Sequence, residues 1–247
     1  MDKVLYLAMS GARENMLAQR AHANNLANAN TTGFKSDLAQ ARAMQVFGEG
    51  YASRVYAQSE RPATDTTTGT LIDTGRKLDV AIDGDGWITV LRPDGTEGYT
   101  RAGELQINAA SQLVTGNGLP VMGNGGIPIV LPDMESLEIA KNGTITIRPL
   151  GAGPDEIEVV DQIKLVNPQP GTLWKGPDGL MQTDNGQPLP QDLNVALRSG
   201  YLESSNVNAV QELTSIIATA RQFEMHVKMM KTAEENSSTA SQIMRLS

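Results

Sequence analysis

The sequence predicts an α+β protein in which an antiparallel β-rich middle domain is inserted between an N-terminal and a C-terminal α-helix. Both ends of the 247-residue chain carry apolar residues at heptad spacing, which is typical of helices that pack along one face. The region between them holds most of the 24 glycines and nearly all of the 12 prolines. It also contains many short β-type runs with no helical run between them, which favours antiparallel pairing.

The N-terminal pattern predicts a helix from residue 3 to about residue 30. Gly33 follows two threonines and is a natural stop, because glycine readily adopts the left-handed conformation that ends helices. Small or polar residues occupy several seam positions and bury far less apolar area than leucine or methionine. We therefore expect this helix to be weak alone and to order against partners. The seam residues are Leu5, Met9, Ala12, Met16, Gln19, Ala23, Leu26 and Asn30.

Residues 36–69 are polar and rich in alanine and threonine, and we expect them to form an extended connector. Residues 70–204 are expected to form the β-rich middle domain. Asn-Gly and Pro-Asp-Gly sequences punctuate it, and these residues suit tight turns because they tolerate positive φ. The predicted strands are LDVAI, GWITVL, ELQIN, QLVTG, LPVMG, IPIVL, LEIA, TITIRPL and EIEVVDQIKLV.

The C-terminal pattern predicts the longest helix of the chain, over residues 205–245. Asn206 or Asn208 is the expected N-cap, because a short polar side chain there accepts hydrogen bonds from the first turn. An ordinary amphipathic helix packed on its own domain would give a similar pattern. Two heptad helices at opposite ends favour antiparallel pairing instead. Residues 1–35 and 205–247 would then form a coiled-coil-like helical assembly module.

Composition argues against several classes of protein. The net charge of −8 gives no field that attracts nucleic acid, so we expect no nucleic-acid partner. There are no cysteines, which excludes disulfides and thiolate sites. No run reaches the ~20 apolar residues of a membrane span, so no membrane insertion is expected. The opening apolar run is short and Asp2 offsets Lys3, so we expect no cleaved signal peptide.

Candidate catalytic and metal-binding residues are sparse. The two histidines, His22 and His226, lie in opposite end helices, and neither has a ligand at helical spacing. We expect them to be surface or interface residues. The segment Asp83-Gly84-Asp85-Gly86 resembles the start of a calcium loop, but Ile88 and Asp94 stand where glycine and glutamate are required, so a tight turn is expected. No metal, cofactor or enzymatic activity is predicted.

Four motifs, in order along the chain, resemble those of the flagellar rod and hook proteins. Residues 24–35 (NNLANANTTGFK) are similar to that family's Asn-Leu-Ala-Asn followed by Thr-x-Gly-(Phe/Tyr)-Lys. Residues 78–87 (LDVAIDGDGW) and 99–103 (YTRAG) match its Leu-Asp-x-Ala-Ile-x-Gly-x-Gly-(Phe/Trp) and Tyr-Thr-Arg-x-Gly. Residues 200–207 (GYLESSNV) match the Gly-x-Leu-Glu-x-Ser-Asn-Val that opens the C-terminal helix. The resemblance spans nearly the whole chain.

The resemblance implies a structural subunit of the bacterial flagellar rod, the drive shaft through the peptidoglycan layer. Residues 221–225 and 234–236 favour the proximal-rod member, and the distal-rod member is the alternative. The resemblance further implies export through the flagellar type III apparatus with an uncleaved N terminus, a periplasmic location in the basal body, and other rod subunits and copies of itself as partners.

The expected assembly interface comprises the helix seams and the exit of the first helix. Its residues are Leu5, Met9, Ala12, Met16, Ala23, Leu26, Asn28, Gly33, Phe34, Leu213, Ile216, Ala220, Phe223, Val227 and Met230. Two other functions stay open at this point. One is a soluble β module that binds carbohydrate or peptide and dimerises through its helices. The other is a secreted hydrolase that uses Asp83, Asp85 or Glu104.

Overall fold

The computed structural model describes residues 2–38, 41–45, 55–59, 63–151, 153, 156–169 and 171–246. It divides into two compact units. We call Met1–Ala29, Ser36–Asp65 and Val207–Ser247 the helical unit, and Asn30–Lys35 and Thr66–Asn206 the β unit. The chain therefore passes between the two units four times. This architecture confirms an α+β protein with a helix at each end and a β-rich middle.

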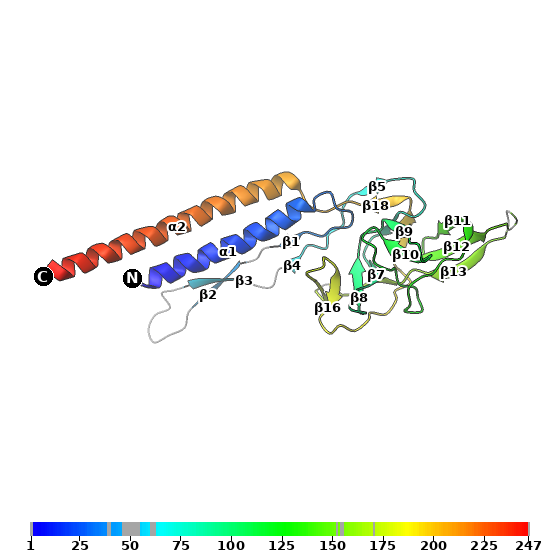
Figure 1. Cartoon of the computed structure of the whole chain (residues 1–247), viewed down its shortest axis with the longest axis horizontal. Coiled ribbons are helices and arrows are strands. Elements are labelled where there is room, and N and C mark those ends of the chain that lie inside the picture. The colour runs from blue at the N-terminus through cyan, green and yellow to red at the C-terminus, as the bar shows by residue number, and fades with distance from the viewer. Residues whose placement is uncertain are drawn as a thin grey trace. The chain divides into compact units, whose positions relative to one another are not determined.

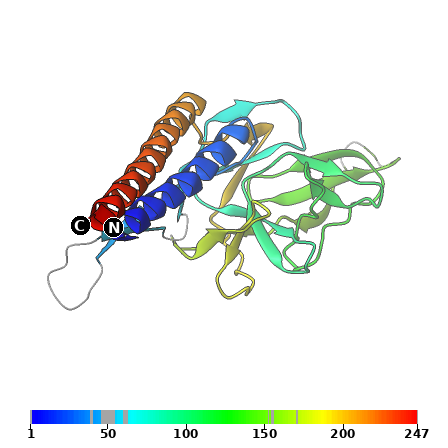
Figure 2. The same ribbon diagram turned by 60° about the vertical axis from the view of Figure 1, so that its left-hand side comes forward.

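The helical unit contains two long helices, α1 (Asp2–Ala27) and α2 (Ala209–Leu246). They lie side by side and run antiparallel (Figures 1 and 2). Two contacts fix their register: Gly11 faces the ring of His226, and His22 pairs with Glu212. The pairing of the end helices is therefore present, whereas coiled-coil geometry stays a prediction.

The ends of the helices follow from local hydrogen bonding. Asn208 is the N-cap of α2, because its Oδ1 accepts hydrogen bonds from the backbone N–H groups of Val210 (3.1 Å) and Gln211 (3.2 Å). At the other end, α1 stops at Ala27, about three residues earlier than expected. The N–H of Ala29 already bonds three residues back, to the carbonyl of Leu26, so the chain leaves the helix in a tight turn.

The predicted connector carries two short antiparallel ladders. β1 (Asp37–Leu38) pairs with β4 (Ala63–Thr64), and β2 (Ala41–Gln45) pairs with β3 (Val55–Ser59). β3 runs beside α1 (Figure 1). These ladders satisfy backbone groups that an extended chain packed on a helix could not give to water. Residues 39–40, 46–54 and 60–62 of this segment lie outside the described residues.

Among the described residues of the β unit, every strand ladder is antiparallel. The largest sheet has the order β14-β7-β8-β16-β15, a second has the order β11-β12-β13, and three two-stranded ladders join β10 to β9, β17 to β6 and β18 to β5. The strands are β5 (Leu71–Asp73), β6 (Val80–Asp83), β7 (Trp87–Leu91), β8 (Glu97–Thr100), β9 (Leu105–Ile107), β10 (Leu113–Thr115), β11 (Met134–Ile139), β12 (Thr144–Pro149), β13 (Glu158–Gln162), β14 (Leu165–Val166), β15 (Leu173–Lys175), β16 (Met181–Thr183), β17 (Ala196–Ser199) and β18 (Tyr201–Glu203).

One hydrophobic core of aliphatic side chains holds this unit together, with a smaller aromatic cluster of Trp87, Tyr99, Val166 and Met181. Glycines at predicted turns have positive φ: Gly95 between β7 and β8, Gly143 between β11 and β12, and Gly179 between β15 and β16. The predicted strands LPVMG and IPIVL form only isolated bridges. Each contains a proline, which has no N–H to give to a ladder.

Candidate assembly site

Small side chains line the face of α1 that packs against α2. Ala8 and Ala12 are buried, and Gly11 lies beside the imidazole of His226. A Cβ atom placed on Gly11 would lie 2.5 Å from Cε1 and 2.8 Å from Nε2 of that ring. The absence of a side chain at Gly11 therefore makes room for His226 at this contact.

We predict that Gly11→Ala destabilises the helix pair, although alanine is the better helix former by about 1 kcal/mol. The new methyl group would displace the His226 ring, and forced overpacking of this kind costs about 1–3 kcal/mol. Thermal melting followed by circular dichroism at 222 nm measures the effect. Gly11→Ala combined with His226→Ala should recover the loss, since it removes the collision. Equal melting of wild type and Gly11→Ala would contradict the contact.

The structure sorts the predicted interface residues into two groups. Some face inward or are half-buried in the helical unit: Ala12, Leu26, Asn28, Ile216, Ala220, Phe223 and Met230. Others are exposed: Leu5, Met9, Met16, Ala23, Leu213 and Val227. The inner face of α1 therefore follows Ala8, Ala12 and Asn25, and the predicted seam shares only part of it. Gly33 and Phe34 belong to the β unit.

A polar clamp joins the end of α1 to the beginning of α2. The buried amide of Asn25 bonds to both backbone groups of Asp37: it donates to the carbonyl (2.9 Å) and accepts from the N–H (2.8 Å). The same amide donates to Glu212 (3.1 Å), whose second carboxylate oxygen pairs with His22. Since a buried amide left without partners would cost 1–3 kcal/mol, Asn25 fixes the chain segment and both helices together.

His22 and His226 thus lie at different levels of the helix pair and do not meet. Within the described ranges no group of three or more His, Asp and Glu side chains is placed to hold a metal ion. The segment 83–86 forms the turn between β6 and β7, with positive φ at Gly84 and Gly86.

A buried ion cluster lies in the β unit, formed by Lys35, Arg101 and Glu203, each at most 3% exposed. Lys35 Nζ lies 2.6 Å from Oε1 of Glu203, and Arg101 Nη1 lies 3.0 Å from its Oε2. The backbone N–H of Gly69 also donates to Oε1 (2.8 Å). One carboxylate thus joins three stretches of chain that are far apart in sequence.

The two cations of this cluster have further partners. Lys35 donates to the carbonyl of Thr67 (2.6 Å), and Arg101 donates to the carbonyl of Gly84 (2.9 Å). The guanidinium of Arg101 also lies over the ring of Trp87, 5.4 Å from its centroid. Buried charges of this kind are tolerated only when paired and hydrogen-bonded.

The segment before Lys35 is fitted closely to the same place. The N–H of Gly33 donates to the backbone carbonyl of Glu203 (2.8 Å), and Gly33 has φ +68°. The ring of Phe34 packs under the ammonium of Lys175, at 3.7 Å from the ring centroid. Lys175 also donates to the carbonyl of Lys35 (2.8 Å). Residues 33–35 are therefore held by backbone, aromatic and ionic contacts together.

Glu203 gives this cluster a pH dependence. Burial raises the pKa of its carboxyl, but the hydrogen bonds from Lys35 and Gly69 and the charges of Arg101 and Lys35 outweigh burial, so the pKa lies below the usual 4.5. A carboxyl with a lowered pKa stabilises the fold fully above the unfolded value. That stabilisation is lost as the pH falls through the folded value.

We therefore predict that the free energy of unfolding of the β unit falls as the pH drops below about 4.5. Urea unfolding followed by tryptophan fluorescence measures it, because Trp87 lies beside the cluster. Lys35→Met, which removes one of the groups that lower the pKa, should show a shallower dependence. Identical pH profiles for the two proteins would contradict this origin of the effect.

Sequence reasoning did not identify this cluster. Each of its charged residues lies inside one of the motifs singled out above: Lys35 in GFK, Arg101 in YTRAG and Glu203 in GYLESSNV. The available signal was a single charged residue within each of three otherwise uncharged motifs. No pattern in the sequence indicates that the three side chains meet.

Comparison with known proteins agrees with these motifs. The family described as "Flagella basal body rod protein" matches residues 5–35, and "Flagellar basal body rod FlgEFG protein C-terminal" matches residues 198–243. "Flagellar hook protein FlgE/F/G D1 domain" matches residues 81–147. The three matches fall on both end helices and on the middle of the chain.

Full-length relatives decide the family. The chain is 39% identical to flagellar basal-body rod protein FlgF of Salmonella typhimurium (strain LT2) and 38% identical to FlgF of Escherichia coli (strain K12), over 100% of both chains in each case. The chain belongs to the family of flagellar basal-body rod proteins. It is also 34% identical to FlgG of Agrobacterium fabrum (strain C58), over 97% of this chain and 98% of the relative.

As a member of the flagellar basal-body rod family, the chain is a structural subunit of the rod and localises to the basal body. The family is structural, and no feature of the described residues points to catalysis. None of the helices searched in the described chain is long and apolar enough to cross a membrane.

Proposed function

We propose that this chain builds the proximal segment of the rod and assembles there into a helical array through its terminal helices. The observation that carries the proposal is the similarity to two FlgF proteins over the whole length of the chain. Its partners are other rod subunits and further copies of itself.

The exposed face of the helix pair supports assembly through the helices. Leu5, Met9 and Met16 lie four and seven residues apart on α1 and are 38%, 49% and 54% exposed. Leu213 and Val227 are similarly exposed on α2. Large apolar side chains in a row on a helix surface are typical of protein–protein contacts. Residues 1–35 and 205–247 form the assembly module of this proposal, residues 36–69 the connector, and residues 70–204 the middle domain.

We further propose that the chain is exported by the flagellar type III apparatus and functions in the periplasm with its N-terminal segment uncleaved. The burial of Ala8 and Ala12 on the inner face of α1 supports this, because cleavage near residue 20 would remove both residues and most of α1. Mass spectrometry of purified basal bodies would detect the intact N-terminal peptide. A peptide that begins beyond residue 20 would overturn the proposal.

A distal-rod subunit is the second candidate, supported by the similarity to the Agrobacterium FlgG protein. Deletion of the gene, followed by electron microscopy of purified basal bodies, distinguishes the two. Basal bodies whose rods lack the proximal segment as well as the distal one support the proximal position. Rods that contain the proximal segment and lack only the distal segment support the alternative, and complete flagella would overturn both.

The exposed apolar side chains Leu5, Met9 and Met16 form an apolar stripe on α1, and this stripe can be tested directly. Met16→Glu should leave the thermal melting of the monomer unchanged and abolish motility in the deletion strain, because it places a charge in the apolar stripe. Gln222→Glu is the matched control: it adds the same charge at an exposed polar position of α2 and should restore motility. Normal motility with Met16→Glu would remove this stripe from the interface.

A further inference from the structure

The net charge of the chain is confined to the β unit. That unit contains ten Lys and Arg residues against eighteen Asp and Glu residues, and the difference of −8 equals the charge of the whole chain. The helical unit contains ten of each and is neutral. Two copies of the β unit therefore repel one another, whereas the helical unit of a second copy does not share that repulsion.

The basic side chains of the two units differ in how they are paired. In the β unit, at least eight of the ten form ion pairs with carboxylates of the same unit, namely Lys35, Arg76, Lys77, Arg92, Arg101, Arg148, Lys164 and Arg198. The helices carry five exposed basic side chains that form no ion pair within the part of the chain that is described: Arg13, Arg20, Arg221, Lys228 and Lys231. These side chains can meet a carboxylate of a neighbouring molecule.

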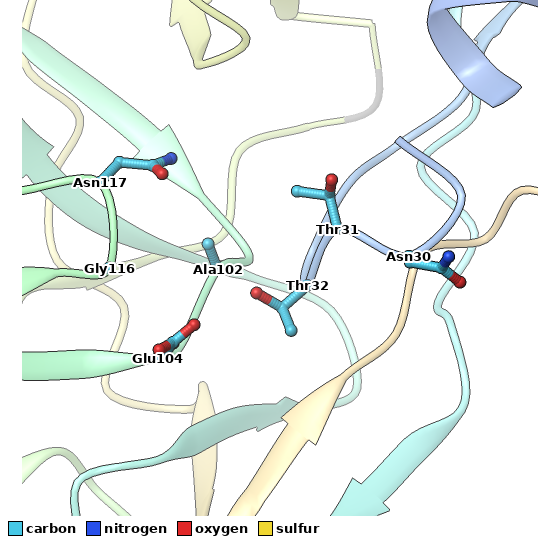
Figure 3. Close-up of a pocket in the computed structure, with 7 residues that line it drawn as sticks. All are labelled: Asn30, Thr31, Thr32, Ala102, Glu104, Gly116 and Asn117. Atoms are coloured by element: carbon cyan, nitrogen blue, oxygen red, sulfur yellow. The ribbon is translucent and has the colours of Figure 1, made fainter. Parts of the chain in front are cut away.

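The β unit has a pocket of about 250 Å³ suited to such a side chain. Its walls are the loop residues 30–32, Ala102, Glu104 and the turn residues 116–117. Figure 3 shows the carboxylate of Glu104 and the hydroxyl of Thr32 turned toward one another across the pocket. The acceptors that line the pocket include the carboxylate of Glu104, the hydroxyl of Thr32 and the side-chain oxygen of Asn117.

Glu104 has no positive partner among the described residues. Within the described part of the chain, its carboxylate accepts one long side-chain hydrogen bond, from Gln106 (3.4 Å), and is partly withdrawn from water. A carboxylate in such a place is stabilised by a donor-only group that carries positive charge. The pocket therefore selects a guanidinium or an ammonium. A hard metal ion would require more carboxylate ligands than one.

We propose that this pocket receives an arginine or lysine side chain from the helical unit of a second copy of the chain. The inference rests on the proposed function, since it requires copies that pack against one another in the rod. In this arrangement Glu104 is a docking residue: it joins the acidic β unit of one subunit to the neutral helical unit of the next.

Charge reversal and rescue test the proposal in the deletion strain. Glu104→Lys should abolish motility, and one of five second substitutions should restore it when combined with it: Arg13→Glu, Arg20→Glu, Arg221→Glu, Lys228→Glu or Lys231→Glu. Each of the five should be tested alone as well, and the rescuing one should be defective by itself. Full motility with Glu104→Lys, or loss of motility that none of the five restores, would overturn the proposal.

Two controls separate docking from folding and from rod function. Glu158→Lys makes the same charge change at an exposed position outside the pocket and should remain motile. Purified Glu104→Lys should melt like wild type; if it unfolds, Glu104→Gln replaces it and should reduce motility at least tenfold without a shift in melting. Unchanged motility of Glu104→Gln would then count against the pocket. Complete flagella in the deletion strain itself would refute the rod function, whatever the Glu104 variants do.

Discussion

Replacement of Glu203 by glutamine is expected to destabilise the β unit by about 3–5 kcal/mol, the cost of leaving buried charges without their partner. Lys35 and Arg101 would then face each other with no carboxylate between them, each at most 3% exposed. Urea unfolding at pH 7, followed by tryptophan fluorescence, measures the loss. The wild-type cluster already holds two cations, Lys35 and Arg101, and only one carboxylate. Removal of Glu203 should therefore cost more stability than removal of either cation.

The order of effects within the cluster makes this prediction specific. Lys35→Met should cost only about 1–2 kcal/mol, since it leaves Arg101 and Glu203 as a balanced pair with their hydrogen bonds. Glu138→Gln is the control for an exposed ion pair: Glu138 and Lys77 are 71% and 61% exposed, so the expected change is below about 1 kcal/mol. A larger effect for Lys35→Met than for Glu203→Gln would refute the central role of the carboxylate.

Gly33→Ala is expected to have the second largest effect, about 3 kcal/mol or more. Two costs combine. An L-residue at φ +68° loses about 1–2 kcal/mol in the left-handed region. The added Cβ would also lie 2.2 Å from the carbonyl carbon of Arg101 and 2.3 Å from the nitrogen of Ala102, and backbone atoms cannot swing aside as a side chain can. We expect residues 30–35 to leave their place and motility to be lost.

Gly95→Ala separates these two costs. Gly95 also has positive φ (+82°), but nothing lies within 4 Å of an added Cβ atom. It should therefore lose only the conformational part, about 1–2 kcal/mol, and retain motility. Urea unfolding of both variants measures the difference. Equal losses would mean that the close approach of Gly33 to Arg101 contributes nothing.

The elements of this fold were largely predictable because their signals are local. Heptad spacing predicted both helices, Asn208 was one of two expected caps, and the Pro-Asp-Gly and Asn-Gly turns lie where β7–β8, β11–β12 and β15–β16 reverse. The ladders in the connector and the sheet order depend on contacts between distant residues, which no local signal encodes.

The candidate site was only partly predictable for the same reason. The helix seams were placed by period, but the direction of α1 is set by Gly11 against His226 and by the buried amide of Asn25, which shifts the inner face away from Met9 and Met16. The Lys35, Arg101 and Glu203 cluster depends on residues more than 60 positions apart. Motif resemblance marked these residues individually, and only the structure brings them together.

Residues 66–206 begin and end at neighbouring points. The side-chain amide of Asn206 donates to the carbonyl of Thr67 (3.3 Å), and the N–H of Thr70 donates to Ser204 Oγ (3.0 Å). A segment whose ends meet can be exchanged for a longer or shorter one without stretching the chain around it. The parts of this segment that do not contact residues 33–35 can therefore change in size, by evolution or by design, while the terminal helices keep their sequence.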